Sequence, residues 1–368
     1  MILLVSHYTR NKGTTDFFRD YLISRNIKHY YLRHPFVFVD DLKYSELVYF
    51  DGKKEKTVSK YKKINNSILD MIRNFIISFY VSIKLNRKIN KIFAFGSFNT
   101  LPFLLSNLFF KRKITFWGVD YSTKRFGNVI MNKIYLVTET VACRYSNRIF
   151  NSSPRQAEAR MKFHGLKEEK SRIFPNGIEK INFKKDFSKY EKIGLLYIGS
   201  ITKQHGIIDF VKKFYINDSI SYALHIIGGG EKEKELNTLV KENNLQDKVK
   251  LYGFLTQSQI QNKLIDINEK LFGIAPYSDK MDDLVYYRDS LKIREYLNYN
   301  IPYIAPRILY VNENLKKFGF IYKNDNELEK ILNDKLIDGF KINQSSVRAV
   351  LYSEYTWNNI LRGALNKK

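Results

Sequence analysis

The chain has 368 residues, of which 44% are apolar, so it is long enough for two domains with buried cores. A single cysteine, Cys143, excludes an internal disulfide and a cysteine-based metal site. No apolar run reaches the roughly 18 residues that a membrane-spanning helix needs. The apolar start 1–5 is too short for a signal peptide and lacks a basic segment before it. These features predict a cytoplasmic protein.

The net charge of +25 is unevenly distributed along the chain. Residues 1–185 hold 35 Lys/Arg against 14 Asp/Glu, whereas residues 186–368 hold 27 against 23. Such unequal halves indicate two domains with different partners. The basic half is expected to be attracted to an anionic partner, which leaves a membrane surface, a phosphorylated acceptor and nucleic acid open.

In the first half, short apolar runs alternate with helical patterns. Strands are predicted at 2–5, 28–32, 91–95, 113–117 and 148–151. Helices are predicted from Thr14 or Thr15 to about Ser24 and at 64–86, 101–110 and 128–146. Residues 40–63 are polar and basic, and we expect a loop or lid with a hairpin there. This alternation predicts a parallel sheet flanked by helices.

The second half repeats the same alternation. Strands are predicted at 194–198, 223–227, 249–252, 271–275 and 303–305, and helices at 207 onward, 231–242, 256–265 and 290 onward. A polar, lysine-rich stretch at 176–191 marks the boundary between the halves. The fold class is therefore α/β, with two doubly wound sheets.

One segment near the end of the second half suits a sugar nucleotide. Asp289 and Ser290 can cap a helix, and Asn300 and Pro302 can end it. The free N–H groups and the positive dipole end of the first turn suit a phosphate. Glu295 lies one turn further along, where its carboxylate can accept hydrogen bonds from two neighbouring hydroxyls such as those of a ribose.

The run Ser290-Leu291-Lys292, followed by Glu295-Tyr296 and Pro302, resembles the donor-binding helix of GT-B glycosyltransferases of the family-4 type. Pro175-Asn176-Gly177 closely matches that family's turn at the end of its first domain. Tyr355-Thr356-Trp357 is similar to the start of its terminal helix.

The resemblance implies two Rossmann-like domains that face a central cleft. The first, 1–178, would bind the acceptor, and the second, 190–350, would bind the nucleotide-sugar donor. A C-terminal helix at 351–368 would cross back to the first domain.

The loop after the predicted strand 194–198 resembles the family's Gly-Arg-x-x-x-x-Lys-Gly loop. Ligands of open α/β sheets bind at the carboxyl ends of strands, and Gly199 would let backbone approach the ligand closely. Ser200 and His205 stand where the family has Arg and Lys, and Lys203 is placed to stabilise a diphosphate leaving group. An ordinary loop between strand and helix is the alternative.

Two further loops resemble donor-binding parts of the family. Gly229 lies in the Gly228-Gly229-Gly230 run, which resembles the family's Gly-x-Gly, and Gly253 with Phe254 follows the next strand, where family backbone contacts the nucleobase. The family's first Glu corresponds to Tyr287 here, so the donor sugar stays open. Asp282, Asp283 or Arg288 can take over contacts to the sugar, and a solvated loop is the alternative.

In the first half, the resemblance places Gly13 and Thr14 opposite the donor phosphates and Asp120 near the reacting sugar. Asp120 can equally cap a helix or a turn. His7 ends the first predicted strand, and a role in the ligand site stays open for it. The histidines show no metal-ligand spacing, and there is no Asp-x-Asp triplet. We therefore expect no metal and no cofactor, and a leaving diphosphate stabilised by Lys203 and helix dipoles.

The sequence thus predicts a glycosyltransferase of the hexosyl type. It would move a sugar from a nucleotide sugar to a glycan or lipid-linked acceptor in cell-surface polysaccharide synthesis, with retention of configuration by family analogy. The protein is expected at the cytoplasmic face of the cell membrane, held on its anionic surface by the basic half. A nucleotide-sugar epimerase of the same fold is the alternative. A nucleic-acid-binding protein is a weaker one, because helix-turn-helix, RNP and zinc-finger motifs are not found.

Overall fold

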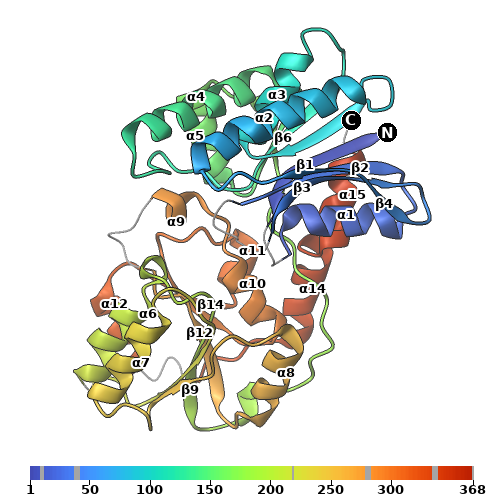
Figure 1. Ribbon diagram of the computed structural model, residues 1–368. Coiled ribbons are helices and arrows are strands. Elements are labelled where there is room, and N and C mark those ends of the chain that lie inside the picture. The colour runs from blue at the N-terminus through green and yellow to red at the C-terminus, as the bar shows by residue number, and fades with distance from the viewer. Residues whose placement is uncertain (9–11, 37–41, 218, 278–282, 334–338, 367–368) are drawn as a thin grey trace. The chain divides into compact units, whose positions relative to one another are not determined.

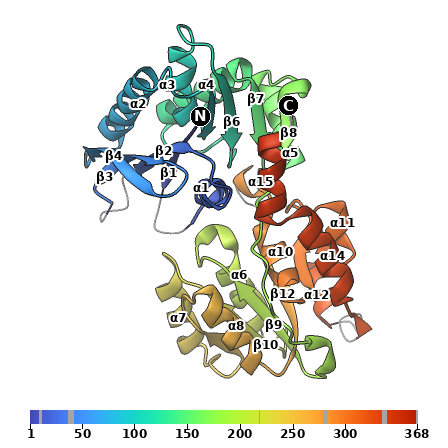
Figure 2. The same cartoon turned by 90° about the vertical axis from the view of Figure 1, so that its right-hand side faces the viewer.

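The computed structural model describes residues 1–8, 12–36, 42–217, 219–277, 283–333 and 339–366 (Figures 1 and 2). The chain divides into two compact units. The first unit comprises residues 1–176 and 357–368, and the second comprises residues 177–356. No helix of the described residues is both long and apolar enough to cross a membrane.

Within the described residues, the first unit has an eight-stranded sheet in the order β4-β3-β2-β1-β5-β6-β7-β8. Its strands are β1 (Ile2–Tyr8), β2 (His29–Pro35), β3 (Tyr44–Phe50), β4 (Glu55–Lys62), β5 (Lys91–Phe95), β6 (Lys113–Gly118), β7 (Arg148–Asn151) and β8 (Ser171–Ile173). Its helices are α1 (Thr14–Ser24), α2 (Ser67–Lys84), α3 (Ser97–Ser106), α4 (Val129–Tyr145), α5 (Pro154–His164) and α15 (Trp357–Asn366). All pairs from β2 through β1 to β8 are parallel, and β3 and β4 join antiparallel at one edge.

Alternate residues of the first strand face opposite layers of helices. Ile2 and Leu4 pack with α1 and α15, while Leu3 and Val5 pack with α2 and α3. Figure 1 shows these helices in two layers, one on each face of the sheet. Both faces of a parallel sheet are covered in this way, which explains why the strands read as continuous apolar runs.

Helix α15 completes the core of the first unit although it lies at the far end of the chain. The ring of Trp357 stacks on Phe17 of α1 with their centroids 4.6 Å apart. Leu361 is fully buried in the same cluster as Phe174. The preceding helix, α14 (Gln344–Glu354), belongs to the second unit.

The described residues of the second unit contain a six-stranded parallel sheet in the order β11-β10-β9-β12-β13-β14. The strands are β9 (Ile193–Ile198), β10 (Ala223–Ile227), β11 (Val249–Leu251), β12 (Lys270–Ile274), β13 (Tyr303–Pro306) and β14 (Gly319–Tyr322). The main helices are α6 (Ile207–Val211), α7 (Glu233–Glu242), α8 (Gln257–Asp266), α9 (Asp283–Tyr287), α10 (Leu291–Asn298), α11 (Glu313–Lys316), α12 (Asp325–Asn333) and α14.

This second sheet is also covered on both faces. Leu196 and Ile198 of β9 pack with α8, α10 and α14, whereas Leu195 and Tyr197 pack with α6, α7 and α12. The predicted fold class, α/β with two Rossmann-like domains, is confirmed.

Three local predictions differ from the structure. The hairpin expected within residues 40–63 is present, since 44–50 and 55–62 pair antiparallel, but its strands extend the edge of the main sheet instead of belonging to a loop or lid. Helix α5 and strand β8 were not predicted as separate elements. The expected tight turn at Pro175-Asn176-Gly177 is wrong: among the described residues, no backbone hydrogen bond closes a turn there, and Ile178 instead pairs with Thr356.

Each sheet has one point where the strand order reverses. In the first unit it lies between β1 and β5, and in the second between β9 and β12. Adjacent loops at such a point leave in opposite directions, so ligands of open α/β sheets bind there, outside the carboxyl ends of the strands. The two reversal points therefore locate the candidate sites.

Candidate functional site

At the reversal point of the second unit, two side chains of α10 form hydrogen bonds that hold the helix against the sheet. Lys292 donates a hydrogen bond from Nζ to the carbonyl oxygen of Ile198 at 2.9 Å and lies 4.1 Å from the centroid of the Tyr197 ring. Tyr296, four residues on, donates to the carbonyl oxygen of Ile274 at 2.7 Å. Positions i and i+4 share one helix face, so α10 bridges β9 and β12.

Glycines make room for both of these side chains. A Cβ at Gly199 would lie 1.8 Å from Lys292 Nζ, and a Cβ at Gly273 would lie 2.3 Å from Cγ of Tyr296. Gly199 also has a φ of +151°, which favours glycine. Lys292 was predicted as a donor-binding residue, and the structure places its ammonium beneath the β9 loop.

The two polar residues just before α10, Asp289 and Ser290, make different contacts from the two side chains that hold the helix against the sheet. Ser290 is the N-cap residue, but its side chain makes no capping bond, and its buried Oγ has no hydrogen-bond partner among the described residues. Asp289 forms a buried ion pair with Arg294, at 2.8 Å for one of its two bonds. The N-terminal turn of α10 therefore keeps its N–H groups and a hydroxyl available for a ligand.

Glu295 is half-buried one turn further along α10. Burial raises the pKa of its carboxyl group, and the nearby charge of Lys292 opposes that rise. Within the described parts of the chain, no hydrogen bond or ion pair to its carboxylate is formed. Two further predicted donor residues lie nearby in the chain: Leu291 is 44% exposed, and Tyr287 is half-buried.

Backbone contacts hold three glycine loops together at this edge. The N–H of Gly199 donates to Ile227, that of Ile201 donates to Gly229, and that of Gly228 donates to Gly253, at 2.8–3.0 Å. A Cβ at Gly228 would lie 1.9 Å from the carbonyl oxygen of Gly199, and Gly228 has a φ of +150°. The triple glycine is thus needed for close packing between two loops, and it is not a flexible turn.

Several predicted donor residues line these loops. Ser200 and Lys203 are exposed on the loop after β9. His205 accepts or donates a 2.9 Å hydrogen bond with Thr202 and lies edge-on to Tyr277, which follows β12. Burial, together with the charges of Lys292 and Arg288, lowers the pKa of His205 to about 3, so this ring is neutral at pH 7.

An exposed aromatic ring stands beside the glycine loops. Phe254 is 71% exposed and follows Gly253, whose φ is +68°. Glu233 of α7 approaches the same place, since its carboxylate would lie 3.0 Å from a Cβ at Gly229. An exposed ring at the carboxyl edge of a sheet offers a flat apolar face to a nucleobase. Asp282 lies outside the described residues, as does the side chain of Asp283.

In the first unit, Gly13 and Thr14 open α1 just after β1. The N–H of Gly13 donates to Asp16 at 2.9 Å, and the hydroxyl of Thr14 donates to Asn176 at 3.2 Å. The predicted glycine loop is therefore tied to the Pro-Asn-Gly segment that ends this part of the chain.

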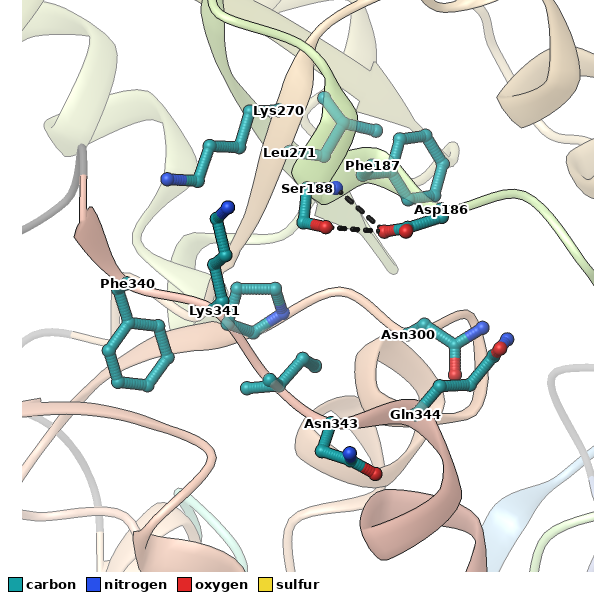
Figure 3. Close-up of a pocket in the computed structure, with 12 residues that line it drawn as sticks. Asp186, Phe187, Ser188, Lys270, Leu271, Asn300, Phe340, Lys341, Asn343 and Gln344 are labelled. Carbon is teal, nitrogen blue, oxygen red and sulfur yellow. Dashed lines mark hydrogen bonds between the residues drawn. The ribbon is translucent and has the colours of Figure 1, made fainter.

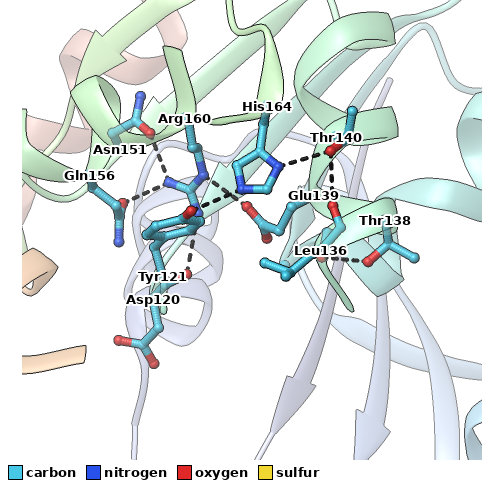
Figure 4. Close-up of polar contacts among 12 residues, drawn as sticks. Asp120, Tyr121, Leu136, Thr138, Glu139, Thr140, Asn151, Gln156, Arg160 and His164 are labelled. Carbon is cyan, nitrogen blue, oxygen red and sulfur yellow. Dashed lines mark hydrogen bonds and ion pairs between the residues drawn. The ribbon is translucent and has the colours of Figure 1, made fainter. Parts of the chain in front are cut away.

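Asp120 follows β6, and a buried arginine positions it (Figure 4). Arg160 of α5 donates from one guanidinium nitrogen to the carbonyl oxygen of Asp120 at 3.2 Å and from Nε to Glu139 at 2.9 Å. A Cβ at Gly118 would lie 2.3 Å from this guanidinium. The Asp120 carboxylate points away from the cluster, towards a weak 3.9 Å ion pair with Arg125.

Sequence reasoning missed this positioning network. Arg160 and Glu139 lie on two helices, and nothing in their spacing along the chain links them. The one available signal was an arginine inside a helix that follows a strand, and it is not specific.

A pocket of about 210 Å³ lies at the reversal point of the first unit. It is lined by β1, α2, α3 and α4, through His7, Met71, Ile72, Asn74, Phe75, Ser78, Phe98, Asn99, Leu101, Ile134 and Thr138. The walls are mainly apolar, and His7 and Asn99 add polar atoms. The pocket was not predicted, because its walls come from four elements that are far apart in the sequence.

His7 is neutral in this pocket. Burial lowers the pKa of its imidazole to about 4, against an opposing effect of Asp70. The amide of Asn99 donates to its Nδ1 at 3.1 Å, which places the ring proton on Nε2. His7 therefore lines this pocket, the candidate acceptor-side pocket, as a neutral ring.

The described residues contain no group of three or more His, Cys, Asp or Glu side chains that could hold a metal ion. The site is thus built from helix termini, glycine loops, cationic side chains and a carboxylate.

Comparison with known proteins identifies the family of part of the chain. Residues 178–268 match the family model of the glycosyl transferases group 1. The match contains the loops after β9, β10 and β11 and ends before α10. No curated protein sequence matches the chain.

Solved structures share the fold over nearly the whole chain. Sucrose-phosphate synthase from Thermosynechococcus elongatus has a TM-score of 0.70 at 14% identity, covering 99% of this chain and 96% of its own. The lipopolysaccharide outer core galactosyltransferase WaaB, in its apo form, has a TM-score of 0.69 at 13% identity, with coverages of 99% and 98%. HepE from Anabaena, in complex with UDP, has a TM-score of 0.70 at 13% identity, with the same coverages.

The family match over residues 178–268 and the GT-B fold shared with the solved structures support a transferase enzyme of the glycosyltransferase type. The predicted resemblance to group 1 glycosyltransferases is confirmed over the matched residues.

The packing of the glycine loops yields a prediction on stability. We expect Gly228→Ala to lower the free energy of unfolding by about 1–3 kcal/mol, because its Cβ would overlap backbone that cannot move aside. Gly339→Ala is the matched control, since among the described residues, its chain neighbours aside, no heavy atom lies within 4 Å of a Cβ at that position. Urea unfolding of both variants measures the effect. Equal stability of the two variants would show that the loops are not packed as described.

Proposed function

We propose that this glycosyltransferase moves a sugar from a nucleotide-sugar donor, bound by the second unit, to a lipid-linked or glycan acceptor, bound by the first unit. The observation that best supports donor binding by the second unit is the free N-terminal turn of α10. It lies at a sheet reversal point, next to three glycine loops, and it holds the unpartnered hydroxyl of Ser290.

The length of α10 fits the spacing of a diphosphate and a ribose. Glu295 lies five residues after Ser290, or about 7 Å along the helix axis. A diphosphate at the first turn would receive backbone N–H groups and the positive dipole end. The Glu295 carboxylate would then accept hydrogen bonds from the two ribose hydroxyls. The relative HepE is described in complex with UDP and with UDP-glucose, which supports a nucleotide sugar as donor.

Cationic groups near this turn support a metal-free reaction. Arg288 and Lys292 act electrostatically on His205, and Lys203 is exposed on the same loop. These cations, with the helix dipole, would stabilise charge on the leaving diphosphate. Asp120, whose backbone is held by Arg160, is the candidate for contact with the reacting sugar. Retention of configuration follows only from the family resemblance, and it is part of the proposal.

The surface around the acceptor-side pocket supports a lipid-linked acceptor. On α2, six large apolar side chains are 43–60% exposed, namely Ile68, Leu69, Ile72, Ile76, Tyr80 and Ile83. On α4, Val129, Ile130, Ile134 and Val137 are 39–81% exposed. We call these ten residues the apolar face. Ile72 and Ile134 also line the pocket, so the apolar face continues into it.

Charge on the same elements favours an anionic membrane as the partner of the apolar face. Residues 67–145 hold twelve Lys/Arg and only three Asp/Glu. Two of these acids, Asp70 and Glu139, are buried. The exposed cations include Lys111 and Lys113 at the start of β6. A protein held there, on the cytoplasmic face of a membrane, would meet an acceptor whose lipid part enters the pocket. An epimerase acting on a soluble sugar nucleotide would need neither feature.

The variant Glu295→Gln tests the proposed contact between Glu295 and the ribose of the donor. Loss of the charged hydrogen bonds to a ribose should weaken UDP binding by about 1.5–3 kcal/mol, or roughly 10- to 150-fold. Glu313→Gln removes the same charge from an exposed position and should leave affinity unchanged. Titration calorimetry with UDP, GDP, dTDP and CMP, with EDTA present, measures affinity, identifies the base and tests the independence from metal. Equal affinity of the Glu295 variant and the wild type would refute the ribose contact.

The membrane half is tested by co-sedimentation with phosphatidylcholine vesicles, with and without phosphatidylglycerol. We expect binding to the anionic vesicles only, and a steep decrease with salt because the attraction is screened. The double variant Lys111→Glu/Lys113→Glu should bind at least about tenfold more weakly, since each basic residue near such a surface contributes about 1 kcal/mol.

The control for this experiment is Lys234→Glu/Lys241→Glu, which makes the same charge change on exposed positions of α7. It should bind like the wild type. Equal binding to neutral vesicles, or equal weakening by both double variants, would rule out docking through the first unit.

A further inference from the structure

A pocket of the second unit lies at the N-terminal ends of its strands, opposite the ends that carry the donor loops. Figure 3 shows the residues that line it. Its volume is about 200 Å³. It lies at the N-terminal ends of β12 and β13, next to Lys270, Leu271 and Pro302, whereas the donor loops follow the C-terminal ends of the strands. The turn at Asp186–Ser188 and the segment 340–344, which leads into α14, complete its walls.

The pocket contains a buried amide without a protein partner. Asn300 is only 8% exposed, and neither Oδ1 nor Nδ2 has a hydrogen-bond partner among the described residues. Nε2 of Gln344, the first residue of α14, is also buried and unpartnered by the same criterion. An unpaired buried polar group costs free energy, so each such group calls for an explanation.

Backbone geometry does not require an amide at position 300. Asn300 has a φ of +59°, in the left-handed region just after α10. Glycine adopts this conformation most easily and would leave no buried amide behind. The asparagine therefore provides one acceptor and two donors that the fold itself does not use.

Charge and shape indicate what these groups bind. The amino groups of Lys270 and Lys341 lie at one end of the pocket, and the amides of Asn300 and Gln344 lie at the other (Figure 3). The oxygen of Asp186 that faces Ser188 is already engaged, since it accepts from the N–H and the hydroxyl of Ser188 at 3.0 and 2.7 Å. A ligand that fits carries an anion at the lysine end and hydroxyls, which both donate and accept, at the amide end.

We propose that this pocket is a second ligand site, which binds a small polyhydroxylated anion of the monosaccharide-phosphate class. Its volume is below the about 300–1,000 Å³ of pockets for drug-sized molecules, which suits a single sugar. Phe187 and Phe340 provide apolar walls of the kind that contact the C–H faces of a sugar ring. The site is separate from the donor site, and its existence does not depend on the proposed function.

The test is titration calorimetry of the full chain with glucose 1-phosphate as the probe, in the presence of saturating UDP. We expect saturable binding, and at least about fivefold weaker binding to Asn300→Gly, because two hydrogen bonds to the sugar are lost while glycine keeps the left-handed backbone. Lys341→Ala, at an exposed position, should weaken binding to a similar degree.

Controls separate this site from the donor site. Glu295→Gln should bind glucose 1-phosphate like the wild type, and inorganic phosphate should bind more weakly than the sugar phosphate. Absence of binding, equal affinity of wild type and Asn300→Gly, or loss of binding in Glu295→Gln would overturn the proposal. Failure of the donor proposal would appear instead as unchanged UDP affinity in Glu295→Gln, so the two outcomes are distinguishable.

Discussion

The ammonium of Lys292 occupies the space that a side chain at position 199 would need. The candidate donor site depends on this close packing of Lys292 against Gly199. Nζ bonds to the carbonyl oxygen of Ile198 and lies over the ring of Tyr197. Gly199 is therefore constrained twice, by the space that Lys292 occupies and by its positive φ. Burial, with the opposing effect of Glu295, lowers the pKa of Lys292 to about 7. A cation whose charge depends on its surroundings thus lies directly below the loop where a diphosphate would bind.

This arrangement separates the residues of α10 into two groups. Lys292 and Tyr296 face the sheet and fix the helix to β9 and β12. Ser290 and Glu295 lie off that face, at the free turn and one turn later, and their side chains make no hydrogen bond within the described residues. The spacing therefore serves two purposes: one set of residues fixes the helix in place, and the other remains available to a ligand. The same division recurs in the first unit, where Arg160 holds the backbone of Asp120 and leaves its carboxylate directed elsewhere.

The sequence predicted most strands well, because buried parallel strands are short apolar runs that end in glycine or polar residues. It also predicted the position of the α10 turn from Ser290, Asn300 and Pro302. It was wrong about capping by Ser290, whose side chain makes no capping bond, and it missed the ion pair of Asp289 with Arg294, a contact that needs the three-dimensional position of a buried arginine. The pocket around His7 and the unpartnered amide of Asn300 could not be predicted from the sequence either. The pocket depends on which elements pack side by side, and the amide on the absence of a hydrogen-bond partner among the described residues. Neither feature leaves a periodic pattern in the chain.

The most direct test of the account is the proton balance of UDP binding. At pH 8 roughly a tenth of Lys292 is protonated in the free protein, given its pKa of about 7. A diphosphate bound at the α10 turn would raise that pKa, so binding should take up a substantial fraction of a proton at pH 8. Calorimetry in two buffers of different ionisation enthalpy measures this uptake. The account predicts uptake by the wild type and none by Lys292→Met, which keeps the packing of the side-chain stem. Binding without proton uptake, or the same uptake in both proteins, would contradict it.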